Sequence, residues 1–206
     1  MPSISYAIPV CNEHAELDNL LTLLSKFKRD DDEIVVQCDS GNTTPEVYEV
    51  INKHKSYIKI VQFALNGNFA AFKNNLKFHC LSQWIFQIDA DELLHEEFLE
   101  YLPQILEDNP TVQLFCLPRI NTVEGLTQDH ITKWGWNVNE KGWVNFPDIQ
   151  TRIIQNSPKI QWVGKVHEVI YGHSSQAVLP IQEEYCILHH KHIKRQEVQN
   201  SLYSTI

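Results

Sequence analysis

Residues 84–91 read WIFQIDAD, a short and mostly apolar run that ends in two acidic residues, Asp89 and Asp91. A run of this length is typical of a strand that is buried on both faces of a sheet. On extended backbone, side chains two residues apart point the same way, so both carboxylates can reach one cation. We therefore expect a strand from Trp84 to Ile88 with a pair of acids after its carboxyl end.

The sequence before this strand alternates between apolar runs and segments with helical periodicity. Strands are expected at Ile4–Val10, Glu33–Cys38 and Ile58–Ala64. Helices are expected at Glu13–Lys28, from Pro45 onward, and at Phe69–Cys80, because apolar residues there recur at helical spacing or a first-turn proline starts the segment. Such alternation predicts an α/β fold with a mostly parallel central sheet flanked by helices.

Each of the four expected strands is followed by a polar loop. The loops are Cys11-Asn12-Glu13, Asp39-Ser40-Gly41, Asn66-Gly67-Asn68 and Asp89-Ala90-Asp91. In parallel sheets, ligands bind beyond the carboxyl ends of the strands, where these loops converge. The sequence therefore predicts a polar pocket at that edge.

Asp89 and Asp91 are candidate ligands for a divalent cation in this pocket. Mg²⁺ and Mn²⁺ prefer oxygen ligands and are often bound by one or two carboxylates together with substrate phosphates. Two acids in a solvated loop are the alternative, and a D-x-D pattern alone does not exclude it. The position after a buried strand at the ligand edge favours a metal site.

The second half of the chain is less regular. A helix is expected at Glu96–Glu107, strands at Val112–Pro118, Gln150–Ile154, Gln161–Val163, Val166–Tyr171 and Tyr185–Leu188, and a closing helix at Glu197–Tyr203. The stretch 119–146 holds three tryptophans among polar residues and shows little periodicity, which favours a long functional loop. No linker divides the chain, so we expect a single domain over residues 1–206.

Composition restricts the partners and the cellular location. The chain has 17 Lys and Arg against 26 Asp and Glu, a formal net charge of -9, which argues against nucleic-acid binding. No apolar run approaches the roughly 20 residues of a transmembrane helix, and the first ten residues lack the pattern of a secretory signal. Five scattered cysteines without CxxC spacing indicate reduced thiols, so a cytoplasmic location is expected.

Several short motifs, in this order, resemble family 2 of the inverting glycosyltransferases, which have the GT-A fold. In the first half they are Ile8-Pro9-Val10-Cys11-Asn12-Glu13, Asp39-Ser40-Gly41, Lys73-Asn74 and Asp89-Ala90-Asp91-Glu92. In the second half they are Pro147-Asp148 with Arg152, Trp162-Val163-Gly164-Lys165 and Val166-His167-Glu168, which resemble the lipopolysaccharide-core β-glucosyltransferase branch. The resemblance implies that residues 1–92 bind the nucleotide sugar and residues 93–206 form the acceptor side.

The resemblance also implies roles on the donor side, with a UDP-sugar as donor and Mn²⁺ or Mg²⁺ as cofactor. Pro9, Asn12 and Glu13 would line the nucleoside pocket, Asp39 would accept a hydrogen bond from the base, Lys73 would face the diphosphate, and Asp89, Ala90 and Asp91 would meet the ribose and the metal. Simpler interpretations stay open. Asn12 and Glu13 suit a helix N-terminus, Asp39 suits a turn, and Lys73 suits an exposed helix surface.

The acceptor side carries further candidates. Transfer needs a base for the acceptor proton, for which Glu168 is the first candidate and Asp148 the second. The alternative is that Glu168 forms a structural ion pair with Lys165 or Arg152. His189, after an apolar strand, is a candidate third metal ligand or a hydrogen-bonded bystander. Candidate acceptor-binding residues are Trp134, Trp136, Trp143, Arg152 and His167, although tryptophans also serve as core residues.

The sequence thus predicts a metal-dependent inverting glycosyltransferase that moves a hexose from a UDP-sugar to a hydroxyl of a glycan or lipopolysaccharide-type acceptor. A sugar nucleotidyltransferase is disfavoured because the loop Val10–Glu13 lacks the glycine-rich, basic character that cradles a triphosphate. The alternative of a non-catalytic relative that binds a sugar nucleotide or carbohydrate stays open, because inactive relatives of an enzyme keep its fold.

Overall fold

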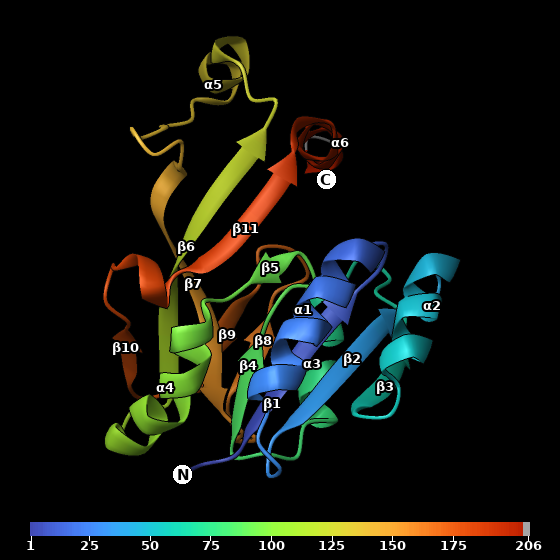
Figure 1. Ribbon diagram of the computed structural model, residues 1–206, viewed down its shortest axis with the longest axis vertical. Coiled ribbons are helices and arrows are strands. Elements are labelled where there is room, and N and C mark those ends of the chain that lie inside the picture. Colours follow the sequence, from blue (N-terminus) through green and yellow to red (C-terminus); the bar gives the residue numbers. More distant parts are fainter. Residues whose placement is uncertain (204–206) are drawn as a thin grey trace.

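The computed structural model describes the backbone of residues 1–203 and the side chains of residues 1–198. Its elements form one large sheet with helices on both faces and a lobe that projects from one end (Figure 1). The order of strands along the sheet is β3-β2-β1-β4-β7-β6-β11-β5, with β10 attached to β6. The predicted fold class, an α/β sheet flanked by helices, is confirmed.

The first half follows the predicted alternation closely. It consists of β1 (Ile4–Val10), α1 (His14–Phe27), β2 (Glu33–Asp39), α2 (Pro45–His54), β3 (Ile58–Phe63), α3 (Phe69–Phe78) and β4 (Trp84–Gln87). β1 pairs in parallel with both β2 and β4, and β2 pairs in parallel with β3. The carboxyl ends of these strands therefore meet at one edge of the sheet, as the sequence predicted.

The core lies on both faces of this sheet because its strands are apolar on both sides. One face packs against α1 and α4, where Leu17, Leu21 and Phe98 are fully or almost fully buried. The other face packs against α3 through Leu76 and against a small hairpin through Ile170. All five cysteines are free and four of them are buried, which confirms the prediction of reduced thiols.

The second half makes the sheet mixed rather than parallel. Its elements are β5 (Glu92–Leu93), α4 (Glu96–Asp108), β6 (Leu114–Glu124), α5 (Gln128–Trp134), β7 (Val144–Gln155), β8 (Gln161–Val163), β9 (Val169–Tyr171), β10 (Gln176–Val178), a 3-10 turn (Glu183–Tyr185), β11 (Ile187–His192) and α6 (Ile193–Tyr203). β7 is antiparallel to both β4 and β6, whereas β11 is parallel to β6. The sheet is parallel throughout from β3 to β4, whereas the rest of it combines parallel and antiparallel pairs.

The projecting lobe differs most from the sequence-based expectation. β6 and β7 run beyond the predicted ends, to Glu124 and back to Val144, and α5 lies between them (Figure 1). The interpretation of residues 128–134 as irregular was wrong. This helix has no buried residue and hence no apolar stripe, but Thr127 and His130 form a capping box and Gly135 ends the helix in the left-handed conformation.

Two shorter corrections concern segments next to the predicted site. β9 begins at Val169 rather than at Val166, because residues 164–168 form a turn in which Gly164 and His167 have φ angles of 96° and 56°. α6 begins at Ile193, four residues before the predicted start. Among the helices of residues 1–203, none has the length and apolar character needed to cross a membrane.

Candidate functional site

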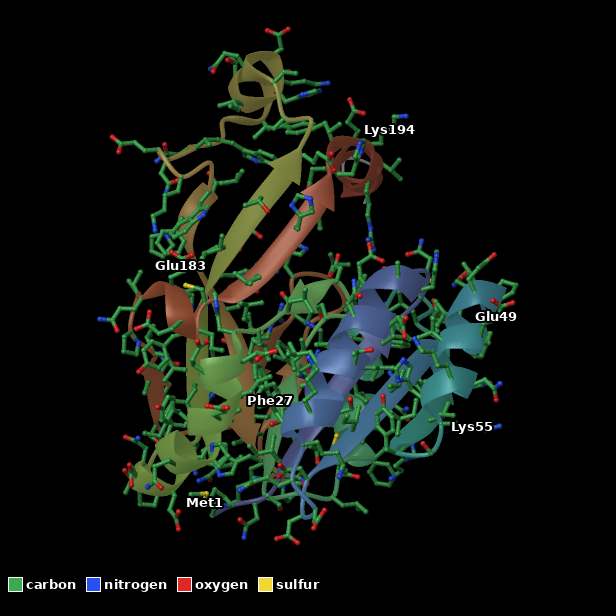
Figure 2. All side chains as sticks on the ribbon, viewed as in Figure 1. Met1, Phe27, Glu49, Lys55, Glu183 and Lys194 are labelled. Atoms are coloured by element: carbon green, nitrogen blue, oxygen red, sulfur yellow. The ribbon has the colours of Figure 1, made fainter. Side chains whose placement is uncertain are left out.

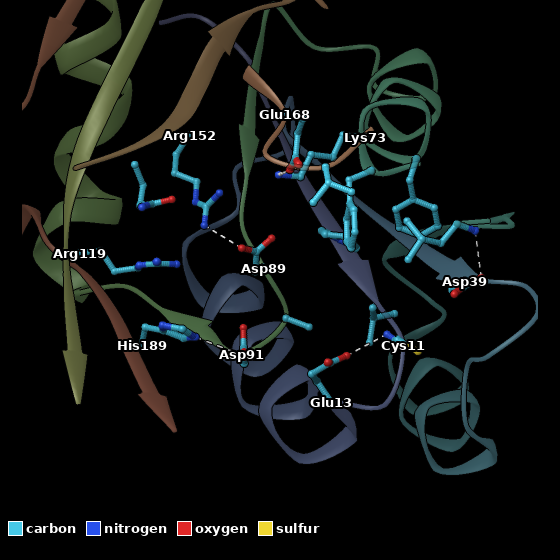
Figure 3. A pocket seen from close by; sticks show the side chains of 18 of the residues that line it. Cys11, Glu13, Asp39, Lys73, Asp89, Asp91, Arg119, Arg152, Glu168 and His189 are labelled. Atoms are coloured by element: carbon cyan, nitrogen blue, oxygen red, sulfur yellow. Dashed lines mark hydrogen bonds and ion pairs between the residues drawn. The ribbon is translucent and has the colours of Figure 1, made fainter. Parts of the chain in front are cut away.

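A cavity of about 600 Å³ opens at the carboxyl ends of β1, β2 and β4 (Figure 3). This volume lies within the usual range of small-molecule sites, about 300–1,000 Å³. Its walls include these candidate residues from the sequence: Pro9, Glu13, Asp39, Lys73, Asp89, Ala90, Asp91, Arg152, His167, Glu168 and His189. Asn12, Asp148, Trp134, Trp136 and Trp143 are not among its lining residues.

Glu13 organises the loop after β1 instead of capping α1 with its side chain. Its Oε2 accepts hydrogen bonds from the backbone amides of Cys11 at 2.8 Å and Asn12 at 2.9 Å. Glu13 occupies the N-cap position of α1, but its side chain makes no capping bond to the helix. The loop is therefore held in a fixed shape by its own carboxylate, with Oε1 still available to a partner from elsewhere in the chain.

Asp39 has a similar role in the loop after β2. It is buried, and its carboxylate accepts bonds from the amide of Leu65 at 3.1 Å and from Nδ2 of Asn42 at 2.8 Å. The bond to Leu65 joins the loops after β2 and β3, which brings both to the cavity. Asp39 is thus a turn-forming residue and a cavity-lining residue at once, and the two interpretations from the sequence do not exclude each other.

Asp89 lies beside a buried network of two arginines and one glutamate. Nη2 of Arg152 is 2.7 Å from Oδ2 of Asp89 and 2.6 Å from Oε1 of Glu92, a residue with no exposed surface. Nη1 of Arg119 is 3.0 Å from the same Glu92 oxygen. Burial acts to raise the pKa of Asp89, but Arg152 and Lys73 outweigh it, so the pKa lies below its usual value.

This network changes the interpretation of Arg152. The sequence predicted it as an acceptor-binding residue, and it does line the cavity. Its side chain is only 4% exposed, however, and the guanidinium is bound to Asp89 and Glu92. Arg152 therefore holds the side chain of Asp89 in place and stabilises its ionised form, a role that the sequence did not indicate.

His189 faces Asp91 in an orientation that a chain of hydrogen bonds determines. Asp148 can only accept, so Nδ2 of Asn121 donates to it at 2.8 Å and Oδ1 of Asn121 points the other way, toward His189. Oδ1 in turn accepts from Nδ1 of His189 at 2.7 Å. The other ring nitrogen, Nε2, then lies 3.4 Å from Oδ2 of Asp91.

The Asp91–His189 pair fits a divalent cation. Two neighbouring ligands of an octahedral ion, each about 2.1 Å from it, are about 3 Å apart, which is close to the observed 3.4 Å. An imidazole whose Nδ1 donates to a second residue is the usual arrangement of a metal-binding histidine. Within residues 1–198, no group of three or more ligand side chains surrounds a single point. Asp91 and His189 are therefore the side chains that could hold a cation here.

The charge on Asp91 is stabilised by its neighbours. Burial acts to raise the pKa of Asp91, but the bond to His189 and the charges of Lys191 and Arg195 lower it far below its usual value. Asp91 is thus ionised at any physiological pH, which is the state that binds a metal.

Glu168 lies on the opposite wall of the cavity and pairs with Lys73. Oε1 of Glu168 is 2.5 Å from Nζ of Lys73, which also lies over the ring of Trp162 at 4.3 Å (Figure 3). The expected structural partners Lys165 and Arg152 are not the ones observed. Lys73 is also not a simple surface lysine, because its side chain is only 13% exposed.

Asn74 fastens the segment that carries Glu168 to α3. Its side chain donates to the carbonyl of Trp162 at 2.8 Å and accepts from the amide of Trp162 at 2.9 Å. The amide of Phe69 donates to the carbonyl of Lys165 at 2.9 Å. These bonds join α3 to β8 and to the turn that follows, and so determine where Glu168 lies.

Asp148, the second candidate base, is fully engaged elsewhere. Its Oδ2 accepts bonds from Nη2 of Arg119 at 2.7 Å and from Asn121, and its Oδ1 accepts from Gln150 at 2.6 Å. Burial acts to raise the pKa of Asp148, but Arg119, Asn121 and Gln150 lower it below its usual value. A carboxylate that has a lowered pKa and does not line the cavity is a poor candidate for the base.

The three candidate tryptophans lie on or near the lobe. The rings of Trp134 and Trp136 are 4.6 Å apart, and Trp143 packs against Phe146. Trp136 lines a second, smaller cavity, whereas Trp134 and Trp143 line neither of the two. Only Trp136 is therefore placed to contact a molecule next to the main cavity in this conformation.

Arg195, which the sequence analysis did not single out, closes one side of the site. From the start of α6, its Nη2 is 2.6 Å from Oε1 of Glu13 and 3.7 Å from Oδ2 of Asp91, and its Nη1 is 3.0 Å from Glu16. The contacts with Glu13 and Glu16 span 182 and 179 residues of sequence, and no local pattern gives a signal for them. Lys191, also missed, could have been found, because it alternates with His189 on β11 and so faces the same side.

Comparisons with known proteins identify the family of this chain. Residues 5–166 match the model of the family described as Glycosyl transferase family 2. The curated protein poly(ribitol-phosphate) beta-N-acetylglucosaminyltransferase TarP of Staphylococcus aureus (strain N315) is 29% identical over 112 residues, which are 53% of this chain and 34% of TarP.

Solved structures give the same fold. The crystal structure of S. aureus TarS 1-349 matches with a TM-score of 0.59 and 13% identity, over 92% of this chain and 60% of that one. The same TarS fragment in complex with UDP-GlcNAc matches with a TM-score of 0.54 and 14% identity, over 90% and 60% of the two chains. The mannosyltransferase PcManGT from Pyrobaculum calidifontis, in complex with GDP-Man and Mn²⁺, matches with a TM-score of 0.50 and 20% identity, over 57% of this chain and 36% of that one.

The chain spans less than two thirds of the length of each of these proteins. The family match, in contrast, covers most of the chain, from residue 5 to residue 166, and ends just before His167 and Glu168. The chain belongs to glycosyl transferase family 2 and has the GT-A fold.

Proposed function

We propose that this chain transfers a hexose from a UDP-sugar to an acceptor hydroxyl, with inversion at the anomeric carbon and with Mn²⁺ or Mg²⁺ as cofactor. The single observation that carries the proposal is the Asp91–His189 pair at the mouth of the 600 Å³ cavity, opposite Lys73 and Glu168. Displacement at a carbon that carries a diphosphate needs positive charge at the leaving group and a proton acceptor for the attacking hydroxyl. One wall of the cavity offers cation ligands and the opposite wall offers a carboxylate.

The donor would lie along the loops after β1, β2 and β4. Asp39 and the loop fixed by Glu13 form the end of the cavity that suits a nucleoside, with Pro9 as an apolar wall. Asp89 and Asp91 lie at the other end, where the diphosphate would enter. The UDP-GlcNAc complex of TarS and the GDP-Man complex of PcManGT support a nucleoside-diphosphate sugar as the donor class.

Asp91 and His189, with Asp89 close by, would hold the cation. A bound Mn²⁺ or Mg²⁺ would neutralise the diphosphate and stabilise the charge that develops on the departing nucleotide. Without a cation, the carboxylates of Asp89 and Asp91 would repel that diphosphate. Donor binding is therefore expected to require the metal.

Glu168 would act as the base. The acceptor oxygen forms a bond to the anomeric carbon while the bond from that carbon to the diphosphate breaks, and the acceptor proton passes to Glu168. Lys73 would be drawn from Glu168 toward the diphosphate when the donor binds, because two phosphates offer more negative charge than one carboxylate. Once Lys73 has moved to the diphosphate, Glu168 would accept the acceptor proton more readily.

The acceptor is less constrained than the donor. The motifs of the second half favour a glycan of the lipopolysaccharide-core type, while TarP, as its name says, acts on poly(ribitol-phosphate). Both are polyhydroxylated polymers, so we propose a glycan or polyol acceptor. A cytoplasmic location stays a prediction from the sequence.

The test is a panel of sugar nucleotides, read by melting shift and by release of free nucleotide with acceptor present. UDP with Mn²⁺ should raise Tm, and EDTA should remove the shift. Glu168→Gln should keep the UDP shift and lower kcat by about 100-fold or more, whereas Glu197→Gln, a control at an exposed acid, should keep both. Full transfer by Glu168→Gln would exclude Glu168 as the base, and a UDP shift that survives EDTA would exclude the metal.

The same experiment separates the non-catalytic alternative. A protein that only binds sugar nucleotides would show the metal-dependent Tm shift without nucleotide release for any acceptor.

A further inference from the structure

The two faces of the large sheet are covered by layers of opposite charge. α1, α2 and α4 cover one face, and Figure 2 looks onto this layer, in which Glu49 of α2 is labelled. These three helices hold nine Asp and Glu and two Lys. α3 and the β8–β9 hairpin cover the other face, and residues 50–88, which include all of α3, contain no Asp or Glu. The formal net charge of -9 therefore does not describe the face of α3 and the hairpin.

The β8–β9 hairpin continues this basic surface. Residues 149–182 contain one acid, Glu168, and its carboxylate lines the main cavity, where it pairs with Lys73. Lys159 precedes β8 and Lys165 follows it, and both residues are exposed. The charges of these two lysines therefore lie on the outside of the hairpin, away from the ion pair in the cavity.

Neighbouring segments add two more cations and one acid. Lys77 of α3 and Lys59 of β3 each donate to a backbone carbonyl, at 2.9 and 2.7 Å, and a carbonyl leaves the positive charge of the ammonium group uncompensated. From the start of β2, the carboxylate of Glu33 accepts bonds from the hydroxyl of Ser5 and the amide of Leu81. Glu33 offsets part of the charge at this edge, and the face as a whole stays positive.

The outer side of the hairpin is apolar. In the register of β8 and β9, Val163 lies opposite Val169, and Tyr171 is two residues further along β9, so all three side chains share one side. The alternate residues, Trp162 and Ile170, are the ones that pack toward α3. Val169 is 61% exposed and Tyr171 73% exposed. Apolar side chains of this size are therefore presented to whatever lies next to the hairpin.

Phe78 extends the apolar side onto α3. Its side chain is 81% exposed, and it lines a shallow pocket together with Lys77, Pro158 and Gln161. Because Gln161 pairs with Tyr171, this pocket connects the end of α3 to the outer side of the hairpin. Basic and exposed apolar residues thus lie on one surface, the hairpin face, which we define as Phe78, Lys159, Val163, Lys165, Val169 and Tyr171.

The composition of the hairpin face favours a lipid surface over a protein partner. Lysine is depleted in the cores of protein interfaces, and a specific interface takes about 800 Å² from each partner. Lysines beside aromatic and aliphatic side chains are instead typical of proteins that lie on an anionic bilayer. There the ammonium groups attract the headgroups, and the apolar side chains enter the boundary with the acyl chains.

We infer that the hairpin face docks on an anionic lipid surface, with Lys159 and Lys165 at the headgroups and with Val169 and Tyr171 in the interface. The turn that carries Glu168 belongs to the same hairpin, so docking would hold the main cavity beside the bilayer. The inference goes beyond the proposed function, because neither donor binding nor transfer requires a membrane.

Co-sedimentation of the full chain with lipid vesicles tests the inference. One set of vesicles contains phosphatidylcholine alone, and the other contains phosphatidylcholine mixed with phosphatidylglycerol. Binding to the mixed vesicles should be at least about ten-fold tighter, and it should weaken as salt is raised. Equal binding to both sets, or binding to neither, would overturn the inference.

A double variant, Lys159→Gln with Lys165→Gln, should weaken binding to the mixed vesicles about 25-fold, because each lysine near an anionic surface contributes about five-fold. Lys26→Gln with Lys53→Gln is the matched control. It removes the same charge from α1 and α2, where both lysine side chains are 60% exposed. An equal loss in the two double variants would show that net charge and not the hairpin face controls binding.

Tyr171→Ala tests the apolar part of the hairpin face. It should weaken binding about five-fold, because removing about 40 Å² of apolar surface from the interface costs that factor. The loss should persist at high salt, which screens the lysines. Tyr101→Ala is the control, since Tyr101 is 64% exposed on α4, in the opposite layer. Unchanged binding of Tyr171→Ala would contradict a docked hairpin, and melting curves identify any loss of folding.

Analytical ultracentrifugation without lipid tests the competing occupant, a second copy of the chain. An association that depends on protein concentration and disappears in the Lys159 and Lys165 double variant would assign the hairpin face to the acidic layer of a second copy, and would overturn the inference. The UDP shift with Mn²⁺ needs no lipid. A normal shift without vesicle binding would refute the docking alone, whereas loss of the shift in the unsubstituted protein would refute the proposed function.

Discussion

The two halves of this protein hold their site residues in different ways. In the first half, Glu13 and Asp39 are fixed by backbone amides a few residues away or in the adjacent loop. Arg119 and Arg152, in the second half, instead hold Glu92, at the junction of the two halves, through ion pairs between segments far apart in sequence. The comparison teaches that the backbone of the loops after β1 and β2 is fixed locally, whereas the contacts between the first half and the second depend on long-range charge, as Arg195–Glu13 also shows.

The largest expected effect concerns Glu92, which lies fully buried between Arg119 and Arg152. Glu92→Gln should lower the free energy of unfolding by about 3–5 kcal/mol, because it leaves the buried guanidinium of Arg152 and the partly buried one of Arg119 with one fewer anion. Urea unfolding measures this loss.

Glu33→Gln, in the first half, is the control for this comparison. Glu33 accepts bonds only from neutral donors, the hydroxyl of Ser5 at 2.6 Å and the amide of Leu81, so its replacement should cost about 1 kcal/mol. Equal losses in the two variants would break the distinction between the halves.

A smaller effect is expected at Asn74, which connects the halves. Asn74→Ala removes both bonds to the backbone of Trp162, so the turn that carries Glu168 should loosen and kcat should fall about ten-fold while the affinity for UDP stays unchanged. Amide hydrogen exchange should accelerate in residues 161–171.

Asn75→Ala is the matched control, since Asn75 is the next residue of α3 and bonds to Gln37 on β2 instead. It should leave exchange in residues 161–171 unchanged. Asn74→Asp, which can still accept from the amide of Trp162, should recover part of kcat. A fall in UDP affinity as large as the fall in kcat would show that Asn74 does not act through the Glu168 segment.

The smallest effect lies in the first half, far from the site. Asp18, on α1, accepts from His54 at 2.5 Å and from Lys53 at 2.8 Å, and these bonds lower its pKa. A carboxyl whose folded pKa is lowered adds stability above its unfolded pKa of about 3.9, and that stability is lost as the pH falls through the lowered value.

Asp18→Asn should therefore destabilise the protein by less than about 1 kcal/mol at pH 7, because Asp18 is partly exposed. The difference from the unsubstituted protein should shrink as the pH falls below about 4. Unfolding curves at pH 7, 5 and 3.5 measure it. A difference that grows toward acid would mean that the ion pair is not its source.

The first half could be predicted from the sequence almost to the residue. Its strands are apolar on both faces and its helices have a regular apolar stripe, so periodicity alone located β1 (Ile4–Val10) without error. The convergence of the loops followed from the rule for parallel sheets. The donor-side candidates accordingly line the cavity, apart from Asn12.

The second half could be predicted only in part, for a physical reason. α5 buries nothing, and the outer parts of β6 and β7 leave the core, so neither has the hydrophobic pattern by which elements are recognised. Ion pairs such as Arg195–Glu13 depend on the tertiary fold and have no local pattern at all.

The position of β11 in the sheet has a consequence for how the protein is made. β11 (Ile187–His192) inserts between β6 and β5, although β5 precedes β6 in the chain by about twenty residues. Until residues 187–192 leave the ribosome, β5 has no neighbouring strand and the corner of Asp91 has no imidazole. The growing polypeptide can shape the loops after β1 and β2 early, but an imidazole reaches Asp91 only after residues 187–192 have emerged.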